Sequence, residues 1–219
     1  ANTRQWFSVY LPKSDPKWPD LEIKDVYVHQ VVRHKSKLRL GEIQANEFRL
    51  LVHFDNEIEQ QRVKARLAKV RSEGFPNYFG PQRFGRGLHN LDRADRMLRV
   101  GLHQRGDRGI LISAARSWLF NCYLSGRLAL GDLTGAGPLY GRSRDPQLGE
   151  QGLNPVYSAW VNGLRKLGVR AGERQLLASP EALTWCFQGK ALELRFRLAS
   201  GVYATSMLSE LFVVRDEAS

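Results

Sequence analysis

The stretch Asn77-Tyr78-Phe79-Gly80-Pro81-Gln82-Arg83-Phe84-Gly85 separates a strand-rich first part of this chain from a helical middle part. Its two glycines and its proline interrupt regular backbone hydrogen bonding, so we expect neither a helix nor a plain strand here. Phe79, Phe84 and Arg83 would then be displayed on a shaped loop. Aromatic faces beside a guanidinium can hold an unstacked base next to a phosphate. The alternative for these residue types is an aromatic turn packed into a core.

The segments before this stretch have regular patterns. Residues 48–54 alternate between apolar and polar types, which predicts a half-buried strand. A helix should follow, capped by Asp55 or Asn56 and ended by Gly74, because its apolar residues recur on one stripe. The stripe consists of Ile58, Val63, Leu67 and Val70.

The remaining elements follow from the same kinds of pattern. They are, in chain order: a strand at 6–11, a β-rich segment at 21–32, helices at 94–100 and 110–130, a loop at 131–152, a helix from Asn154-Pro155 to Gly168, a strand at 192–198 and a helix at 203–212. This order predicts an α+β fold, with a mainly antiparallel mixed sheet and a helical insertion.

The chain is strongly basic, with a net charge of +11 over 219 residues. A protein this basic usually meets a polyanion, and nucleic acid is the first candidate. The densest run is Arg33 to Arg39, in which Arg33, Lys35 and Lys37 could follow a line of phosphates. The alternative is a solvated, exposed hairpin.

Other classes of function find little support in the sequence. The two cysteines, Cys122 and Cys186, are isolated, and the five histidines lack the spacing of metal ligands. No glycine-rich phosphate loop and no G-x-S-x-G elbow occurs. We find no membrane-spanning run and no signal peptide. We therefore expect a cytoplasmic protein without a metal site. We also expect a monomer.

Two single residues allow more than one interpretation. Arg116 lies inside an apolar helical segment and needs a partner, so it is either a structural ion-pair residue, which we favour, or a phosphate contact. Tyr203 follows Gly201 at a strand-to-helix transition, where it could stack, donate a hydrogen bond or belong to the core.

Several motifs converge on one family. They are Asn77-Tyr78-Phe79-Gly80-x-Gln82-Arg83-Phe84-Gly85, Thr3-Arg4-Gln5-Trp6-Phe7-Ser8, Arg33-His34-Lys35-x-Lys37-Leu38, Ala115-Arg116-Ser117-x-Leu119-Phe120-Asn121, Gly137-Pro138-Leu139-Tyr140-Gly141 and Tyr203-Ala204-Thr205-Ser206-x-Leu208-x-Glu210-Leu211. In these motifs, and in their order along nearly the whole chain, the sequence resembles the TruD family of tRNA pseudouridine synthases. The aromatic motif is specific; the others are strong only together.

The resemblance implies an isomerase that converts uridine to pseudouridine at position 13 of the tRNA D-arm without a cofactor. It also implies the pseudouridine synthase core, formed by residues 1–92 and 181–219, with a TruD-specific helical domain inserted at 93–180.

The resemblance also implies roles for individual residues. Asn77 and Phe79 would shape the uridine pocket, with Phe79 placing the flipped base. Tyr203 would lie under the uracil ring, where many relatives carry Phe. Arg83 would either contact phosphate or give the loop its structure.

Two departures from the family pattern matter. The family's catalytic Asp lies in a Gly-Leu-Lys-Asp-Arg motif just upstream of the segment that matches Thr3, and neither Asp15, Asp20 nor Asp25 has that context. We therefore expect this sequence to be part of a longer polypeptide whose nucleophile precedes it. The family also usually has several tens more residues between Leu130 and Gly131, so this member is short there or a loop is missing.

Two other hypotheses compete with the enzyme. One is a basic RNA-binding module without catalytic activity, and the other is a chaperone-like RNA protein. The net charge of +11 fits all three.

Overall fold

The computed structural model describes residues 4–10, 24, 26–39, 42–54, 60–101, 106–144 and 154–212. The chain divides into two units, Ala1–Gln44 and Ala45–Ser219. The second unit contains the helices and strands discussed below, and its elements confirm the predicted α+β class.

A three-stranded antiparallel sheet forms one part of the second unit, from strands at both ends of its sequence. Its strands are β1 (Ala45–His53), β7 (Ala191–Ala199) and β6 (Glu181–Gln188), in the order β1-β7-β6. In β7 the predicted alternation is confirmed, because all its apolar residues from Leu192 to Leu198 are buried. Phe48 pairs with Phe196 across the sheet, and their rings stack with centroids 5.1 Å apart.

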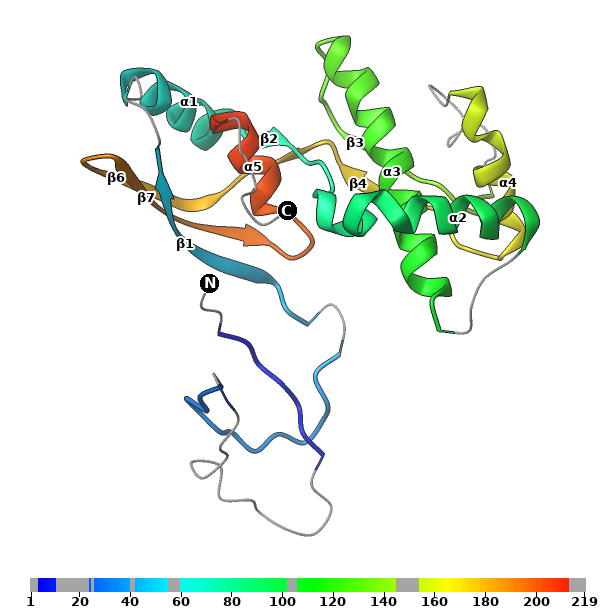
Figure 1. The fold of residues 1–219 in the computed structure, drawn as a ribbon, viewed down its shortest axis with the longest axis horizontal. Coiled ribbons are helices and arrows are strands. Elements are labelled where there is room, and N and C mark those ends of the chain that lie inside the picture. Colours follow the sequence, from blue (N-terminus) through cyan, green and yellow to red (C-terminus); the bar gives the residue numbers. More distant parts are fainter. Residues whose placement is uncertain are drawn as a thin grey trace. The chain divides into compact units, whose positions relative to one another are not determined.

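Two helices cover one face of this sheet (Figure 1). Helix α1 (Gln60–Glu73) buries Val63, Leu67 and Val70, as predicted, and Gly74 ends it with a φ of +80°. Helix α5 (Ala204–Leu211) buries Met207 and Leu211 in the same cluster. Ile58 and the expected caps Asp55 and Asn56 lie outside the described residues.

A helical part lies between the first strand of the sheet and the other two in the sequence. Its helices are α2 (His89–Val100), α3 (Arg108–Ala129) and α4 (Ser158–Lys166), and α2 crosses α3 (Figure 1). The Asn154 side chain caps the 3₁₀ turn Pro155–Tyr157 before α4, as predicted, by accepting a bond from the backbone N–H of Val156 at 3.1 Å. Among the described residues, no helix is long and apolar enough to cross a bilayer.

Two short antiparallel pairs connect these parts. Strand β2 (Phe75–Pro76) leads into the helical part and pairs with β5 (Leu177–Ala178), which leads out of it. Strand β3 (Ala136–Leu139) pairs with β4 (Gly172–Gln175), just before β5. The entry and the exit of the helical part therefore lie side by side. The boundaries expected for an inserted domain, 93 and 180, stay a prediction.

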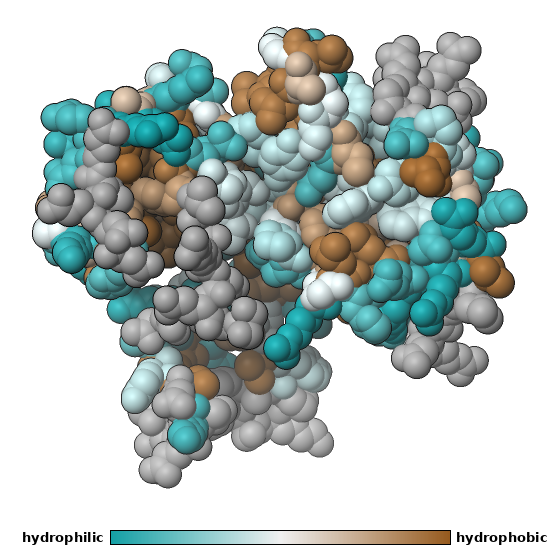
Figure 2. All heavy atoms as spheres, turned by 45° about the horizontal axis from the view of Figure 1, so that its top comes forward, coloured by the Kyte–Doolittle hydropathy of each residue, from teal (hydrophilic) through white to brown (hydrophobic). Residues whose placement is uncertain are grey.

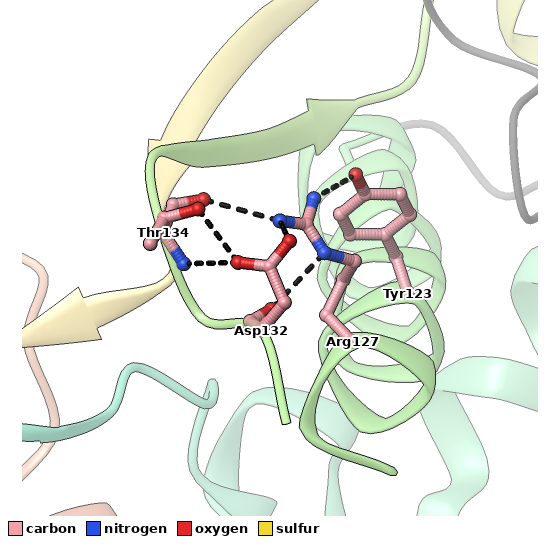
Figure 3. A network of polar contacts seen from close by, with 4 residues as sticks. All are labelled: Tyr123, Arg127, Asp132 and Thr134. Carbon is pink, nitrogen blue, oxygen red and sulfur yellow. Dashed lines mark hydrogen bonds and ion pairs between the residues drawn. The ribbon is translucent and has the colours of Figure 1, made fainter. Parts of the chain in front are cut away.

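A polar network closes the turn between α3 and β3, where the family pattern leads us to expect extra residues (Figure 3). Arg127 donates to the Tyr123 hydroxyl at 2.8 Å and to the Asp132 carboxylate at 2.6 Å. The Thr134 hydroxyl and N–H also donate to this carboxylate, and these bonds, followed by the one from Arg127, lower the pKa of Asp132. Hydrophobic side chains cover this end of α3 (Figure 2), where Leu130 is 80% exposed.

Three sequence predictions are wrong. Residues 6–10, the described part of the expected strand at 6–11, are not a strand, and residues 26–32 contain an isolated bridge residue, Val26, but no strand. Strand propensity reflects the fit to a half-buried sheet surface, and within the described part of Ala1–Gln44 these segments lie exposed without a partner strand. The loop expected at 131–152 contains β3, which Gly137 and Pro138 conceal because neither favours a strand.

We expect opposite effects from the same substitution at two helical glycines. A Cβ at Gly163 in α4 would lie 2.5 Å from the Leu98 carbonyl oxygen, so Gly163→Ala should lower the free energy of unfolding by about 1–3 kcal/mol. Gly126 in α3 is exposed and has open space around it, so Gly126→Ala should raise this free energy by about 0.5–1 kcal/mol. Urea unfolding of both variants tests this; stabilisation by both would show that α2 and α4 are not packed this closely.

Candidate functional site

The aromatic stretch is fixed to helix α3 through the main chain of Phe79. The Asn121 side chain accepts from the Phe79 N–H at 2.9 Å and donates to the Phe79 carbonyl at 3.0 Å. One amide therefore satisfies both backbone groups of Phe79, which explains why Asn121 belongs to one of the family-like motifs. The Phe79 ring meets the Phe120 ring edge to face, with centroids 5.6 Å apart.

Tyr203 reaches the same place from the other end of the sequence. It stands at the N-cap position of α5, and its ring centroid lies 5.8 Å from that of Phe79 in an edge-to-face arrangement. Both rings are only partly buried, so both keep a surface for a ligand. The two residues that the family resemblance assigns to the uridine thus lie next to each other, and their roles there stay a prediction.

Side chains of the Tyr203 segment also approach the backbone of the aromatic stretch. Ser206 in α5 donates to the Tyr78 carbonyl at 2.8 Å. A Cβ at Gly80 would lie 2.7 Å from the Thr205 hydroxyl oxygen and 2.8 Å from Tyr203 Cδ1. Glycine is therefore needed at position 80 for this close approach, a more specific reason than the interruption of regular structure.

Asn77 is buried and forms a structural junction between the entry and the exit of the helical part. Its side-chain amide donates to the Gln175 carbonyl at 2.9 Å, and its backbone N–H donates to the Leu176 carbonyl at 2.8 Å. Its side-chain oxygen and its carbonyl both accept from Arg174. Asn77 therefore lies next to the rings, and its polar atoms are occupied by the protein.

Arg83 bridges the aromatic stretch, α3 and the Tyr203 segment. Its Nε donates to the Tyr203 hydroxyl at 2.9 Å, and its Nη1 donates to the Ser113 hydroxyl at 3.0 Å. Its Cζ lies 5.7 Å from the centroid of the Phe79 ring and 5.8 Å from that of Tyr203. These contacts support the loop-structuring role; a phosphate contact stays a prediction.

Arg174 is the site residue that sequence reasoning missed. Its Cζ lies 4.0 Å from the Phe79 ring centroid, and its Nε donates to the Asn77 carbonyl at 3.1 Å. Burial, and to a smaller extent the positive charge of Arg83, lowers the pKa of Arg174 to about 10. The residue stays cationic at neutral pH. Its neighbours Gly172 and Glu173 are not typical of a strand, so no periodic pattern marked it.

Phe84 is not displayed on the loop, in contrast to the expectation from the sequence. Pro81–Phe84 forms a 3₁₀ turn, and this turn directs Phe84 into the core between α2 and α3. Phe84 is 4% exposed and packs edge to face on Trp118, with centroids 5.6 Å apart. The core alternative holds for Phe84, whereas Phe79 lies at the site.

Arg116 has the structural role that we favoured, but with other partners. Its guanidinium donates to the carbonyl oxygens of Tyr140, Leu139 and Arg170 at 2.9–3.0 Å. Burial lowers the pKa of Arg116. Carbonyls of β3 and of the segment before β4 thus replace the expected carboxylate.

The basic run belongs to the unit Ala1–Gln44. Arg33, Lys35 and Lys37 are exposed there, and the neighbouring His34 ring nitrogen lies 2.9 Å from the Ser36 carbonyl. Their contact with nucleic acid stays a prediction.

The second unit therefore brings together Asn77, Phe79, Arg83 and Tyr203 and adds Arg174. Two partly exposed aromatic rings lie beside two guanidinium groups. Such a set can stack a planar base and attract an anion.

Comparisons with known proteins point in one direction. A family model described as tRNA pseudouridine synthase D (TruD) matches residues 1–97. A protein named tRNA pseudouridine synthase D from Aeromonas salmonicida is 33% identical over 254 aligned positions, which cover 96% of this chain and 72% of the relative. One of the same name from Cellvibrio japonicus is 38% identical over 240 positions, covering 99% and 71%.

A solved structure has a similar fold. It is the crystal structure of a candidate tRNA pseudouridine synthase D from Methanosarcina mazei, with a TM-score of 0.53 and 16% sequence identity. The match covers 88% of this chain and 74% of the Methanosarcina chain. The alignment with the Aeromonas protein has more positions than the 219 residues of this chain. The Aeromonas protein therefore contains residues that have no counterpart in this chain.

We expect Asn121→Ala to loosen the aromatic stretch. The substitution leaves the N–H and the carbonyl of Phe79 without partners, so it should lower the free energy of unfolding by about 2–3 kcal/mol. The control Asn154→Ala removes one exposed cap bond and should cost about 1 kcal/mol. Urea unfolding measures both; equal losses would mean that the amide of Asn121 does not hold Phe79.

Proposed function

Because the chain belongs to the tRNA pseudouridine synthase D family, we propose that it isomerises uridine in tRNA to pseudouridine. The observation that carries this proposal is the meeting of Phe79 and Tyr203, two rings from distant segments, beside the guanidinium groups of Arg83 and Arg174. In this proposal the target is the uridine at position 13 of the D-arm, as the resemblance to the family implies.

The reaction explains why the site needs such rings. The glycosidic bond between N1 and the ribose must break, the uracil must turn, and C5 must bond to C1′ with loss of its proton. A base in a stack cannot turn, so it is first extruded, which costs a few kcal/mol. Contact with aromatic faces returns about 1–3 kcal/mol per base.

The residues of the site have positioning roles in this proposal. Phe79 places the flipped base, and Tyr203 lies under the uracil ring. Asn77 shapes the pocket through the bonds that join it to β4 and Arg174. None of them is the nucleophile, a role that the family resemblance assigns to an Asp.

The RNA backbone would be held by cations. Arg33, Lys35 and Lys37 would contact phosphates in this proposal, and Arg83 would do so beside the rings. The finer features belong to the same proposal: a monomer that acts in the cytoplasm, without metal or cofactor.

A tritium-release assay tests the function and the role of Phe79 together. The full-length protein should release label from tRNA that carries [5-³H]uridine; normal tRNA binding without release would favour an RNA-binding module.

Phe79→Ala should lower kcat/KM about 10- to 100-fold and change tRNA affinity little, because phosphate contacts dominate affinity. Phe84→Ala, in the same stretch but buried, should instead lower stability by about 3–5 kcal/mol. Equal losses of turnover and binding in Phe79→Ala would make Phe79 a core residue.

The basic run has its own test. In the double variant Arg33→Ala, Lys37→Ala, the slope of log K against log salt for tRNA binding should fall by about 0.7–0.9 for each phosphate that the protein no longer neutralises. Lys69→Ala is the control, because Lys69 is an exposed cation of α1 that pairs with Glu73. An unchanged slope in the double variant would remove the run from the RNA interface.

A further inference from the structure

Arg174 and Arg83 form a pair of cations without an acidic partner. Their hydrogen bonds go to carbonyl, amide and hydroxyl groups, and within the described residues no carboxylate forms an ion pair with either one. Other arginines of the second unit do have such partners, as Arg49 has Glu193 and Arg127 has Asp132. Among the described residues, the lack of a carboxylate partner is therefore a feature that these two arginines of the site share.

In the protein without a ligand, this arrangement of two cations costs free energy. A partly buried cation loses hydration, and a second cation nearby adds repulsion. Both guanidinium groups lie within 5.7 Å of the centre of the Phe79 ring. The ring face offsets a small part of this cost, roughly 0.5–2 kcal/mol per cation. An anion bound beside the ring would offset a larger part of this free-energy cost.

Arg174 still has donors to offer. Its Nε and Nη2 are occupied by Asn77, and none of the hydrogen bonds within the described residues uses its Nη1. A Cβ built on Gly201, two residues before Tyr203, would lie 3.8 Å from that Nη1. This edge of the guanidinium thus faces the segment that carries the second ring. Arg83 likewise has an Nη2 without a bond within the described residues.

We propose that Arg174, together with Arg83, binds the backbone phosphate of the nucleotide whose base lies against Phe79 and Tyr203. The proposal rests on the proposed function and adds to it a residue of β4, at the exit of the helical part. A phosphate of the same nucleotide necessarily lies close to the base that the rings hold. The planar fork of Arg suits phosphate oxygens, and Asn77 fixes its orientation.

The experiment removes one charge from each side of the contact. The RNA is the tRNA substrate with a single methylphosphonate, which is neutral, at the phosphate 5′ or 3′ of the target uridine. The protein is the full-length enzyme, compared with Arg174→Gln, which removes the charge and keeps an amide to bond Asn77. Arg127→Gln is the control, because Arg127 is a partly buried arginine of α3 without contact to the rings. Both kcat/KM and the dissociation constant are measured.

One pattern of results supports the phosphate contact. One of the two methylphosphonates should lower kcat/KM of the wild type and of Arg127→Gln about 10- to 100-fold, as expected for one charged hydrogen-bonded contact. In Arg174→Gln the same change in the RNA should cost less than about threefold, because the variant no longer carries the charge that the phosphate would meet.

Two other results overturn it. If both methylphosphonates cost as much in Arg174→Gln as in the wild type, Arg174 only positions Asn77 and Phe79. If neither affects the wild type, the site does not hold a backbone phosphate. Should Arg174→Gln fail to fold, Arg174→Lys keeps the charge and removes the fork, and it should show an intermediate penalty. A wild type that binds the RNA but forms no pseudouridine would contradict the proposed function, while the dissociation constants still test the phosphate contact.

Discussion

The site depends on a single side-chain amide, that of Asn121, which holds the main chain of Phe79 against α3. This bond decides where the aromatic ring can lie, because it fixes the backbone on both sides of the Phe79 Cα. The ring packs against two hydrophobic clusters, a large one among the helices and a small one made of Phe120, Leu124 and Leu176. Tyr203 follows the sheet and Phe120 belongs to α3, so the position of Phe79 joins both parts of the unit.

The excess of positive charge explains much of the hydrogen bonding. With 33 Lys and Arg against 22 Asp and Glu, many arginines have to find partners other than carboxylates. Arg116 uses three carbonyl oxygens, Arg127 uses a carboxylate and a phenol, and Arg174 uses an amide and an aromatic face. The first two sets satisfy their guanidinium groups within the protein. Among the described residues, the third set leaves Nη1 of Arg174 without a hydrogen bond, and this nitrogen belongs to the guanidinium that lies over the Phe79 ring.

The sequence predicted elements whose cause is local. Strand β7 and helix α1 were found because a strict apolar period and a terminal glycine lie within the segment itself. Strand β3 was missed, and no strand was expected at β4, because each is four residues long and needs a partner about 35 residues away. The motifs singled out Phe79 and Tyr203, whereas residue type alone could not separate Phe79 from Phe84, which a 3₁₀ turn sends into the core. Arg174 acquires its role only through the pairing of β2 with β5.

That pairing also explains how the helical part can vary without disturbing the rings. Strands β2 and β5 bring the entry and the exit of the helical part together, so Asn77 and Arg174 meet whatever the length of chain between them. Relatives with additional residues can therefore keep this junction, provided that the insertions fall between the two strands. In this chain, the turn after α3 is closed by Arg127 and Asp132 at the far end of that helix from Ser113, the partner of Arg83 (Figure 3). The junction of β2 and β5 is thus a second constraint on the geometry of the site, beside the amide of Asn121, and it does not depend on the size of the helical part.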